Sequence, residues 1–353
     1  MAVGLPMKTT YADGDVWSAS DVDDITGTIN LVGQTNNFYA GKNRVINGDF
    51  GVWQRGTSFA SPGDGVYTAD RFITYQNGTG FTRTISQQTF TAGTAPVSGY
   101  EGTYFFRYLC SALGTGNTYQ AIQNRVEDVR TFAGQTATFS FWAKADSAKT
   151  ITLNISQNFG SGGSTAVAVN TTTTYTLSTS WTRYTTTVSV PSIAGKTIGT
   201  SSFLQVGFEL GSQTITFDTW GWQLEAGSTA TAFQTATGTK QGELAACQRY
   251  YNRIIATGSI YAKMGTGLAA STTLAQIVVP FPVEMRVVPT SVDYSTLGLY
   301  DGGLVAITAV ALDGQNARAG GVSCTSSGLT VYRPYILISN ASANGYLGFS
   351  AEL

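Results

Sequence analysis

The sequence contains no histidine and few charged residues. Of its 353 residues, 12% are Asp, Glu, Lys or Arg, and the net charge is −1 at pH 7. No run of Lys and Arg is present to neutralise phosphates, which argues against a nucleic-acid-binding protein. Without histidine, neither a Ser-His-Asp triad nor a Cys-His pair can form. The composition therefore argues against the commonest hydrolase mechanisms.

Cysteine is also scarce. Cys110, Cys247 and Cys324 are far apart in the sequence, and none shows the CxxC spacing of a metal or redox site. Because a catalytic cysteine normally needs a histidine base, we expect free, partly buried thiols in a protein assembled in the cytoplasm.

Long hydrophobic runs are missing as well. The longest apolar stretch, residues 277–283, contains two prolines and is far shorter than the ~20 residues of a membrane helix. The first residues lack the charged start and apolar core of a signal peptide. We therefore expect a protein that is synthesised in the cytoplasm and does not insert into a membrane.

The residues that are abundant favour strands and turns. The chain has 18 Tyr, 18 Phe and many Thr, which fit a pleated, half-buried surface, and its 41 Gly supply turns. This composition predicts a mainly β protein rather than a helical or α/β one.

Residues 43–236 predict a central antiparallel sandwich of the jelly-roll kind. Ile151, Leu153 and Ile155 alternate with polar residues, as in strands with one wet face. Many short strands of this kind, separated by loops rich in Gly and Ser, are typical of a sandwich.

Within 215–224 the apolar phase changes. Ile215 and Phe217 are followed by Trp220 and Trp222, which are out of step with them by one residue. Because a two-residue period changes phase only through an extra residue, we expect a bulge near 218–219. Trp220 and Trp222 should then share one buried face.

The two ends differ from this central region. Residues 1–42 predict an arm, and not a domain, with a short helix that begins at a capping box formed by Ser20 and Asp23. Residues 237–253 predict a linker helix with Leu244, Cys247, Gln248 and Tyr251 on one face. Residues 254–353 predict a C-terminal β domain for trimerisation or for the tip of the molecule.

The arm carries a short apolar seam with coiled-coil spacing. A helix this short needs copies of itself or a docking partner for stability, although packing on the next domain is the alternative. The residues expected to serve attachment or oligomerisation are Trp17, Val22, Ile25, Ile29 and Val32.

Several short motifs occur in order along nearly the whole chain. They are GDVWSASDV (14–22), RVINGDF (44–50) with WQRG (53–56), YTADRF (67–72), FSFWAK (139–144), WQLEAGS (222–228) with ATAF (230–233), ELAACQRYY (243–251), PVEMR (282–286) with PT (289–290), and AEL (351–353). Together they resemble bacteriophage tail-fibre and virion fibre proteins with a carbohydrate-binding-module-like jelly-roll domain.

This resemblance implies a structural virion component, assembled in the host cytoplasm, that displays a glycan-binding β domain. Its expected partners are other copies of itself as a homotrimer, virion proteins of the tail or capsid through residues 1–42, and a host surface glycan. The alternatives are a head-fibre, capsid-decoration or tail-connector protein without a receptor role. A fibre-borne glycosidase would need a pair of carboxylates, which no motif brings together, so we expect no enzyme activity.

Aromatic faces with polar neighbours suit sugar binding, although large aromatics more often form cores and interfaces. The glycan-binding candidates are Trp53, Gln54, Arg55, Asp70, Arg71, Tyr75, Trp142 and Gln223. No cofactor is expected. Related modules often carry an acidic residue where this chain has Gly51, which leaves Asp218 as the one candidate ligand for a Ca²⁺ ion that prefers six to eight oxygens.

Overall fold

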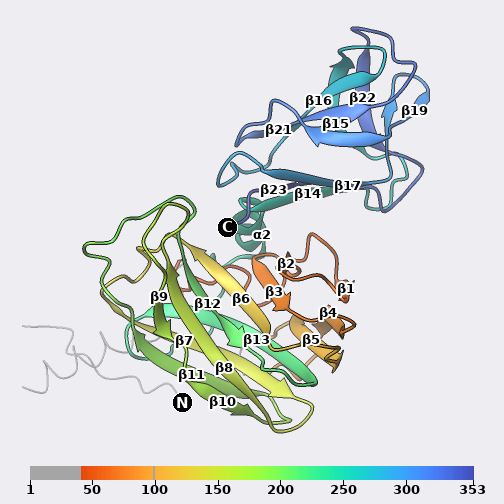
Figure 1. Ribbon diagram of the computed structural model, residues 1–353. Helices are drawn as coiled ribbons and strands as arrows, with labels where there is room; N and C mark the ends of the chain where they lie inside the picture. Colours follow the sequence, from red (N-terminus) through yellow and green to blue (C-terminus); the bar gives the residue numbers. More distant parts are fainter. Residues whose placement is uncertain (1–40, 98–99) are drawn as a thin grey trace, which may run out of the picture.

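The structure is a computed structural model that describes residues 41–97 and 100–353. This part of the chain is mainly β, with antiparallel pairing throughout its four sheets and one helix. Figure 1 shows a central sandwich and a smaller C-terminal β domain, with the helix and the carboxyl end between them. The predicted mainly β class is confirmed. The predicted arm helix, with Trp17, Val22, Ile25, Ile29 and Val32, lies outside the described residues.

The central domain contains two sheets that face each other. The six strands of the first sheet are, in spatial order, β1 (Ser58–Ala60), β4 (Thr82–Thr89), β5 (Tyr104–Ala112), β13 (Ile215–Ala226), β7 (Thr136–Ala145) and β11 (Thr182–Ser189). The second sheet contains β10 (Thr174–Leu177), β8 (Lys149–Asn158), β12 (Phe203–Glu209), β6 (Gln120–Glu127), β3 (Phe72–Gln76) and β2 (Val66–Tyr67), with β9 (Val167–Asn170) paired to β8.

The alternation of side chains along the strands produces the core between these sheets. Ile151, Leu153 and Ile155 of β8 point inward and are fully buried. Phe139 and Phe141 of β7 point inward from the opposite sheet, and these side chains belong to one apolar cluster. The predicted antiparallel β-sandwich is therefore confirmed.

A bulge interrupts β13, two residues later than expected. The pairing of β13 with β7 shifts between Trp220 and Gln223, and Gly221 has a φ of +67°. Because the extra residue lies between the two tryptophans, Trp222 enters the main core and Trp220 enters a separate aromatic cluster. The prediction that they share a face was wrong, although both are fully buried.

The linker helix is shorter than predicted. Helix α2 spans Lys240–Gln248, begins at the N-cap Thr239 and is followed by strand β14 (Tyr251–Ile255). Tyr251 thus belongs to a strand and not to the helix face, and Leu244 is 39% exposed. The apolar spacing was misleading because Tyr251, the first residue of β14, also fits the helical spacing of Cys247 and Gln248.

The C-terminal domain also has two sheets. The first contains β14, β23 (Tyr346–Ser350) and β17 (Ser291–Ser295). The second contains β19 (Leu304–Ala306), β18 (Leu297–Tyr300), β22 (Pro334–Ser339), β15 (Lys263–Ala269), β16 (Leu274–Pro280), β21 (Ala319–Thr325) and β20 (Ala309–Leu312). A second apolar core lies in this domain.

The three cysteines and the single described helix bear on the expectations for thiols and for membrane insertion. Cys110, Cys247 and Cys324 are free and buried, as predicted, and burial raises the pKa of the Cys324 thiol to about 12. No helix in residues 41–97 or 100–353 combines the length and apolar character needed to span a membrane.

Candidate functional site

Three of the predicted glycan-binding residues lie at the junction between the two domains. Arg71 is 1% exposed and forms an ion pair with Glu352, and Arg55 lies 3.3 Å from the same carboxylate. The Arg71 guanidinium also lies 3.4 Å from the ring centre of Tyr250, and that of Arg55 lies 3.5 Å from the ring centre of Tyr251. Gln54 donates a hydrogen bond to the Tyr251 carbonyl oxygen. These contacts hold the domains together.

Asp70 supports the same junction from the interior of the central domain. It is 1% exposed and accepts a 2.9 Å hydrogen bond from the backbone N–H of Gln54 and another from the Gln54 side chain. Burial raises the pKa of the Asp70 carboxyl to about 6, although the charge of Arg55 opposes the shift. Its oxygens are engaged by protein groups and do not face solvent.

The remaining predicted residues are also engaged with protein groups. Trp142 is 6% exposed in the aromatic cluster around Trp220, and the buried Gln223 side chain donates to Glu225 at 2.7 Å. Tyr75 is half-buried, and its hydroxyl accepts a 2.7 Å hydrogen bond from Arg125. The structure therefore does not bring the predicted set together on one surface.

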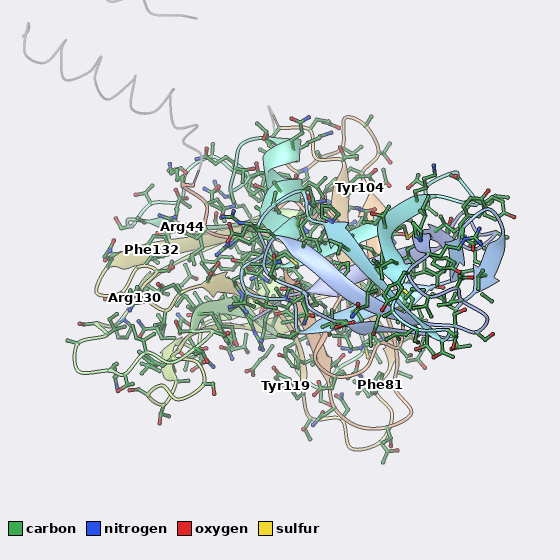
Figure 2. All side chains as sticks on the ribbon, turned by 90° about the horizontal axis from the view of Figure 1, so that it is seen from above. Arg44, Phe81, Tyr104, Tyr119, Arg130 and Phe132 are labelled. Carbon is green, nitrogen blue, oxygen red and sulfur yellow. The ribbon has the colours of Figure 1, made fainter. Side chains whose placement is uncertain are left out.

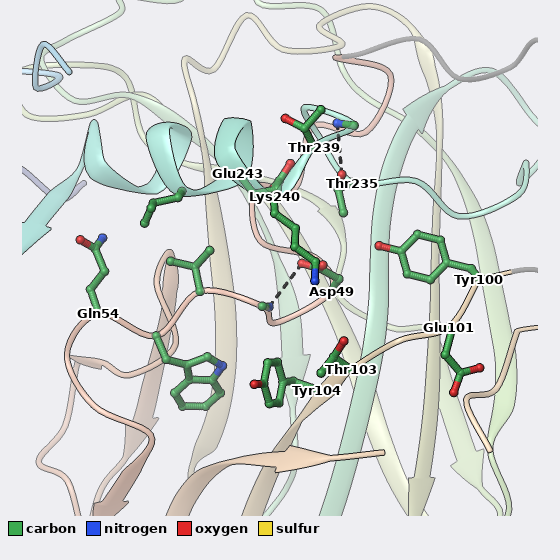
Figure 3. A pocket seen from close by; sticks show the side chains of 15 residues that line it. Asp49, Gln54, Tyr100, Glu101, Thr103, Tyr104, Thr235, Thr239, Lys240 and Glu243 are labelled. Carbon is green, nitrogen blue, oxygen red and sulfur yellow. Dashed lines mark hydrogen bonds between the residues drawn. The ribbon is translucent and has the colours of Figure 1, made fainter. Parts of the chain in front are cut away.

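Trp53 and Gln54 do line a pocket of about 510 Å³, a volume typical of small-molecule sites. Its walls come from three segments far apart in the sequence: the loop after residue 48, the connection from β4 to β5, and the start of α2 (Figure 3). Its lining residues are Asp49, Gly51, Val52, Trp53, Gln54, Tyr100, Glu101, Thr103, Tyr104, Thr235, Gly238, Thr239, Lys240, Glu243 and Leu244.

Asp49 is the central polar group of this pocket. Its carboxylate is half-buried, and the backbone N–H of Gly51 donates to it at 3.3 Å. Burial, and then the negative charge of Glu243, raise the pKa of Asp49 to about 6. Within the described chain Asp49 forms no ion pair, although Lys240 reaches toward it from the helix (Figure 3). The carboxylate is thus free to contact a ligand.

Glu243 has a structural role beside it. Its oxygens accept hydrogen bonds from the backbone N–H groups of Asn47 (2.8 Å) and Thr237 (2.7 Å) and from the Thr237 hydroxyl (3.0 Å). Glu243 is 3% exposed and lies in the first turn of α2, where the helix dipole favours an anion. These contacts fix the start of the helix against the loop that carries Asp49.

Aromatic rings form the apolar walls. Tyr104 is half-buried, and Figure 3 shows it near Thr103 beneath Asp49, with Tyr100 on the far side. The pKa of Tyr100 is raised, by burial first and then by the charges of Asp49 and Glu243. Trp53 contributes only an edge, because it is 9% exposed and its indole N–H donates to the carbonyl of Phe50 at 2.8 Å.

Sequence reasoning placed Trp53 and Gln54 among the candidates but missed Asp49, Tyr100, Tyr104 and Lys240. Asp49 stands in the motif RVINGDF, in which no local pattern marks its carboxylate as a binding group. Tyr100 and Tyr104 have no local pattern that distinguishes them from core aromatics. Their position at the pocket depends on the pairing of strands across the sheet.

A neighbouring surface has a different character. Arg44 lies over the ring of Phe132, with its guanidinium carbon 5.9 Å from the ring centre (Figure 2). A smaller pocket of about 250 Å³ is lined by Arg44, Asn124 and Tyr250 among others. Among its described lining residues, this smaller pocket has no pair comparable to Asp49 and Tyr104, in which an unpaired carboxylate lies beside an aromatic ring.

Asp218, the candidate Ca²⁺ ligand, is already paired. Arg107 donates two hydrogen bonds to its carboxylate, at 2.7 and 2.8 Å, and Lys144 lies 3.7 Å away. Among residues 41–97 and 100–353, no three His, Cys, Asp or Glu side chains gather in a way that could hold a metal ion. The donor set around Asp218 therefore does not fit a calcium site.

Comparisons with known proteins give similarities of structure only. No known family and no curated protein matches the sequence. Similar solved structures include a CBM4 module (21% identity, TM-score 0.32, covering 52% of this chain and 99% of the other). A second is the family 11 carbohydrate-binding module from Clostridium thermocellum in complex with a β-1,3-1,4-mixed-linked tetrasaccharide (11%, 0.30, 49% and 98%).

A third is the enzymatically active domain of tailspike protein 4 of bacteriophage CBA120 (13% identity, TM-score 0.33, covering 52% of this chain and 21% of the other). All three identities are below 25% and all three TM-scores are below 0.5. Similarity of this degree identifies neither a ligand nor an activity. The resemblance to phage fibre proteins stays a prediction.

Proposed function

We propose that this protein is a glycan-binding protein and that the pocket around Asp49 is its binding site. The observation that carries this proposal is the combination of a half-buried, unpaired carboxylate with the ring of Tyr104 in one pocket of about 510 Å³. A sugar presents apolar C–H faces and hydroxyl groups, which suit an aromatic wall and a hydrogen-bond acceptor respectively.

Binding without catalysis is the better interpretation of the two acidic groups. A glycosidase needs two carboxyl groups that both face the scissile bond. Glu243 instead accepts three hydrogen bonds from Asn47 and Thr237, which engage both of its oxygens. We therefore propose no enzyme activity for this pocket. Sustained release of reducing sugar from a host polysaccharide would overturn this view.

The experiment for glycan binding uses the full chain on a glycan array, followed by titration calorimetry with the best ligand. We expect Tyr104→Ala to lower the affinity at least about tenfold, because it removes the aromatic wall. The matched control is Tyr332→Ala, since Tyr332 is 80% exposed in the C-terminal domain. Equal losses in both variants, or no binding to any glycan, would contradict the proposal.

We further propose that the chain is a subunit of a phage virion fibre, with a homotrimer as its assembled form and residues 1–42 as its attachment arm. The motifs of the sequence support this assignment, and the C-terminal sheet offers a surface for contact between copies. Across its outer face, cross-strand neighbours form an uncharged row of Leu304, Tyr300, Ile336, Thr266 and Val278. Leu304, Tyr300 and Val278 are 45%, 42% and 55% exposed.

A deletion of residues 1–42 tests the virion assignment. We expect the shortened chain to keep the circular dichroism of a folded β protein and to lose incorporation into particles. Incorporation at the normal level would contradict the role of the arm. A head-fibre or decoration protein would show the same loss of incorporation but would not compete with phage for host cells.

A further inference from the structure

The charge of the pocket restricts the kind of sugar that it can take. Asp49, Glu101 and Glu243 contribute three carboxylates to its lining, and Lys240 contributes one ammonium group. Lys240 and Glu101 are exposed, and Glu101 accepts a 2.7 Å hydrogen bond from the backbone N–H of Gly93, whereas Asp49 is half-buried. An anionic ligand would therefore be repelled from the position next to Asp49, and a cationic one would be attracted.

The environment of Asp49 also favours a cationic ligand. A carboxylate withdrawn from water is costly unless a cation or several hydrogen-bond donors face it. Here Gly51 supplies one hydrogen bond of 3.3 Å, and Glu243 adds a second negative charge nearby. Glu243 is neutralised by no ion pair in the described chain but by backbone donors and the helix N-terminus. The exposed Lys240 is therefore the one cation of the pocket lining near Asp49, and Asp49 forms no ion pair with it in the described chain.

We propose that the pocket selects a saccharide that carries a free, protonated amino group and that Asp49 forms an ion pair with this group. This inference rests on the proposed glycan-binding function and names the class of sugar. The ring of Tyr104 contacts the apolar face of the sugar, while the ammonium group lies against the carboxylate of Asp49. Acidic sugars are excluded by the same charges.

The pH dependence of binding follows from the groups around Asp49. These are Glu243 and Lys240 on α2, Tyr100 and Glu101 on the connection from β4 to β5, and Tyr104 on β5. Burial raises the pKa of Asp49 to about 6. Below that pH the carboxyl is neutral and cannot pair with an ammonium group, so the affinity falls. It falls again as the pH rises through neutrality, because the amine of a glucosamine unit is weakened by its electron-withdrawing oxygen neighbours and loses its proton there.

The experiment compares three tetrasaccharides by calorimetry with the full chain: a β-1,4-glucosamine oligomer, its N-acetylated counterpart and a galacturonic acid oligomer. We expect the free-amine oligomer to bind at least about tenfold more tightly than the N-acetylated one, and the acidic one not to bind. Asp49→Asn keeps the shape and an acceptor for the Gly51 N–H. It should lower affinity for the amine about tenfold and leave binding of the N-acetylated oligomer within about twofold.

Two controls separate this selectivity from general attraction to a polycation. Glu284→Gln removes the same charge at an exposed site in the C-terminal domain, and should leave the affinity for the amine unchanged. Equal affinity for the amine and N-acetylated oligomers would overturn the charge selectivity while glycan binding stood. An equal loss in Glu284→Gln and Asp49→Asn would also overturn it. Absence of binding to any oligosaccharide would instead remove the proposed function itself.

Discussion

Glu352 forms an ion pair with Arg71, a residue 281 positions earlier in the chain. The same carboxylate lies 3.3 Å from Arg55, so one anion neutralises two cations of the central domain. Tyr250 and Tyr251, which follow α2, each lie against one of these guanidinium groups. The junction is therefore built from a carboxyl-terminal acid, two arginines of the first loops and two tyrosines after the helix.

Glu352→Gln should weaken this junction strongly. It leaves two poorly solvated guanidinium groups without their shared anion, and loss of one partner from a buried ion pair costs about 3 to 5 kcal/mol. We expect that decrease in the free energy of unfolding by urea, together with faster proteolysis between residues 237 and 255.

Glu284→Gln is the matched control for this prediction. Its partner Arg318 lies 3.1 Å away, but the two side chains are 55% and 80% exposed. An exposed pair of this kind contributes about 0 to 1 kcal/mol. If both variants lost the same free energy, the junction would not depend on the burial of Glu352.

Gly221→Ala should disrupt the bulge of β13. The φ of +67° is unfavourable for alanine, and its Cβ would lie 2.6 Å from the indole ring of Trp142. Left-handed strain of about 1 to 2 kcal/mol and overpacking of about 1 to 3 kcal/mol should add in this variant. Chemical denaturation measures the sum.

Gly227→Ala separates the two contributions to that loss. Gly227 follows the end of the same strand, has a φ of +100° and has open space at the position of a Cβ. We expect only the backbone strain there. A loss in Gly221→Ala no larger than in Gly227→Ala would show that the contact with Trp142 is unimportant.

The local features of the fold were predictable, and the relationships between distant residues were not. The alternation of Ile151, Leu153 and Ile155 is a property of consecutive residues, and it correctly identified a half-buried strand. The change of phase in β13 revealed that a bulge exists. Its place at Gly221 depends on which residue tolerates a positive φ, a consideration that favours glycine over residues 218–219.

The residues of the candidate site were harder to predict, because they come together from distant parts of the sequence. Arg71 carries the polarity of a ligand-binding residue, but its partner Glu352 lies in another domain, and no local pattern connects the two. Conversely, Asp49 and Tyr104 line the same pocket because the connection from β4 to β5 passes beside the loop that follows residue 48. Such contacts are set by sheet topology, which composition and periodicity do not determine.

Calcium should have no effect on stability. Asp218 is paired with Arg107 and Lys144, so a Ca²⁺ ion would have to displace two cations and recruit further oxygens. We expect the melting temperature to stay the same in excess EDTA and in millimolar CaCl₂. A rise on addition of calcium that is absent in Asp218→Asn would contradict this prediction and restore Asp218 as a metal ligand.

Self-association through the C-terminal sheet is testable at Val278. This residue is 55% exposed at the end of the uncharged row on the outer face, between Thr266 of β15 and Gly321 of β21. If copies pack face to face there, Val278→Lys places like charges at the contact and buries them without partners. We expect the full chain to sediment as a trimer and this variant as a monomer at micromolar concentration. Thr185→Lys, at an exposed position of β11, should stay trimeric. Monomers of the unmodified chain, or trimers of both variants, would show that this face does not hold the copies together.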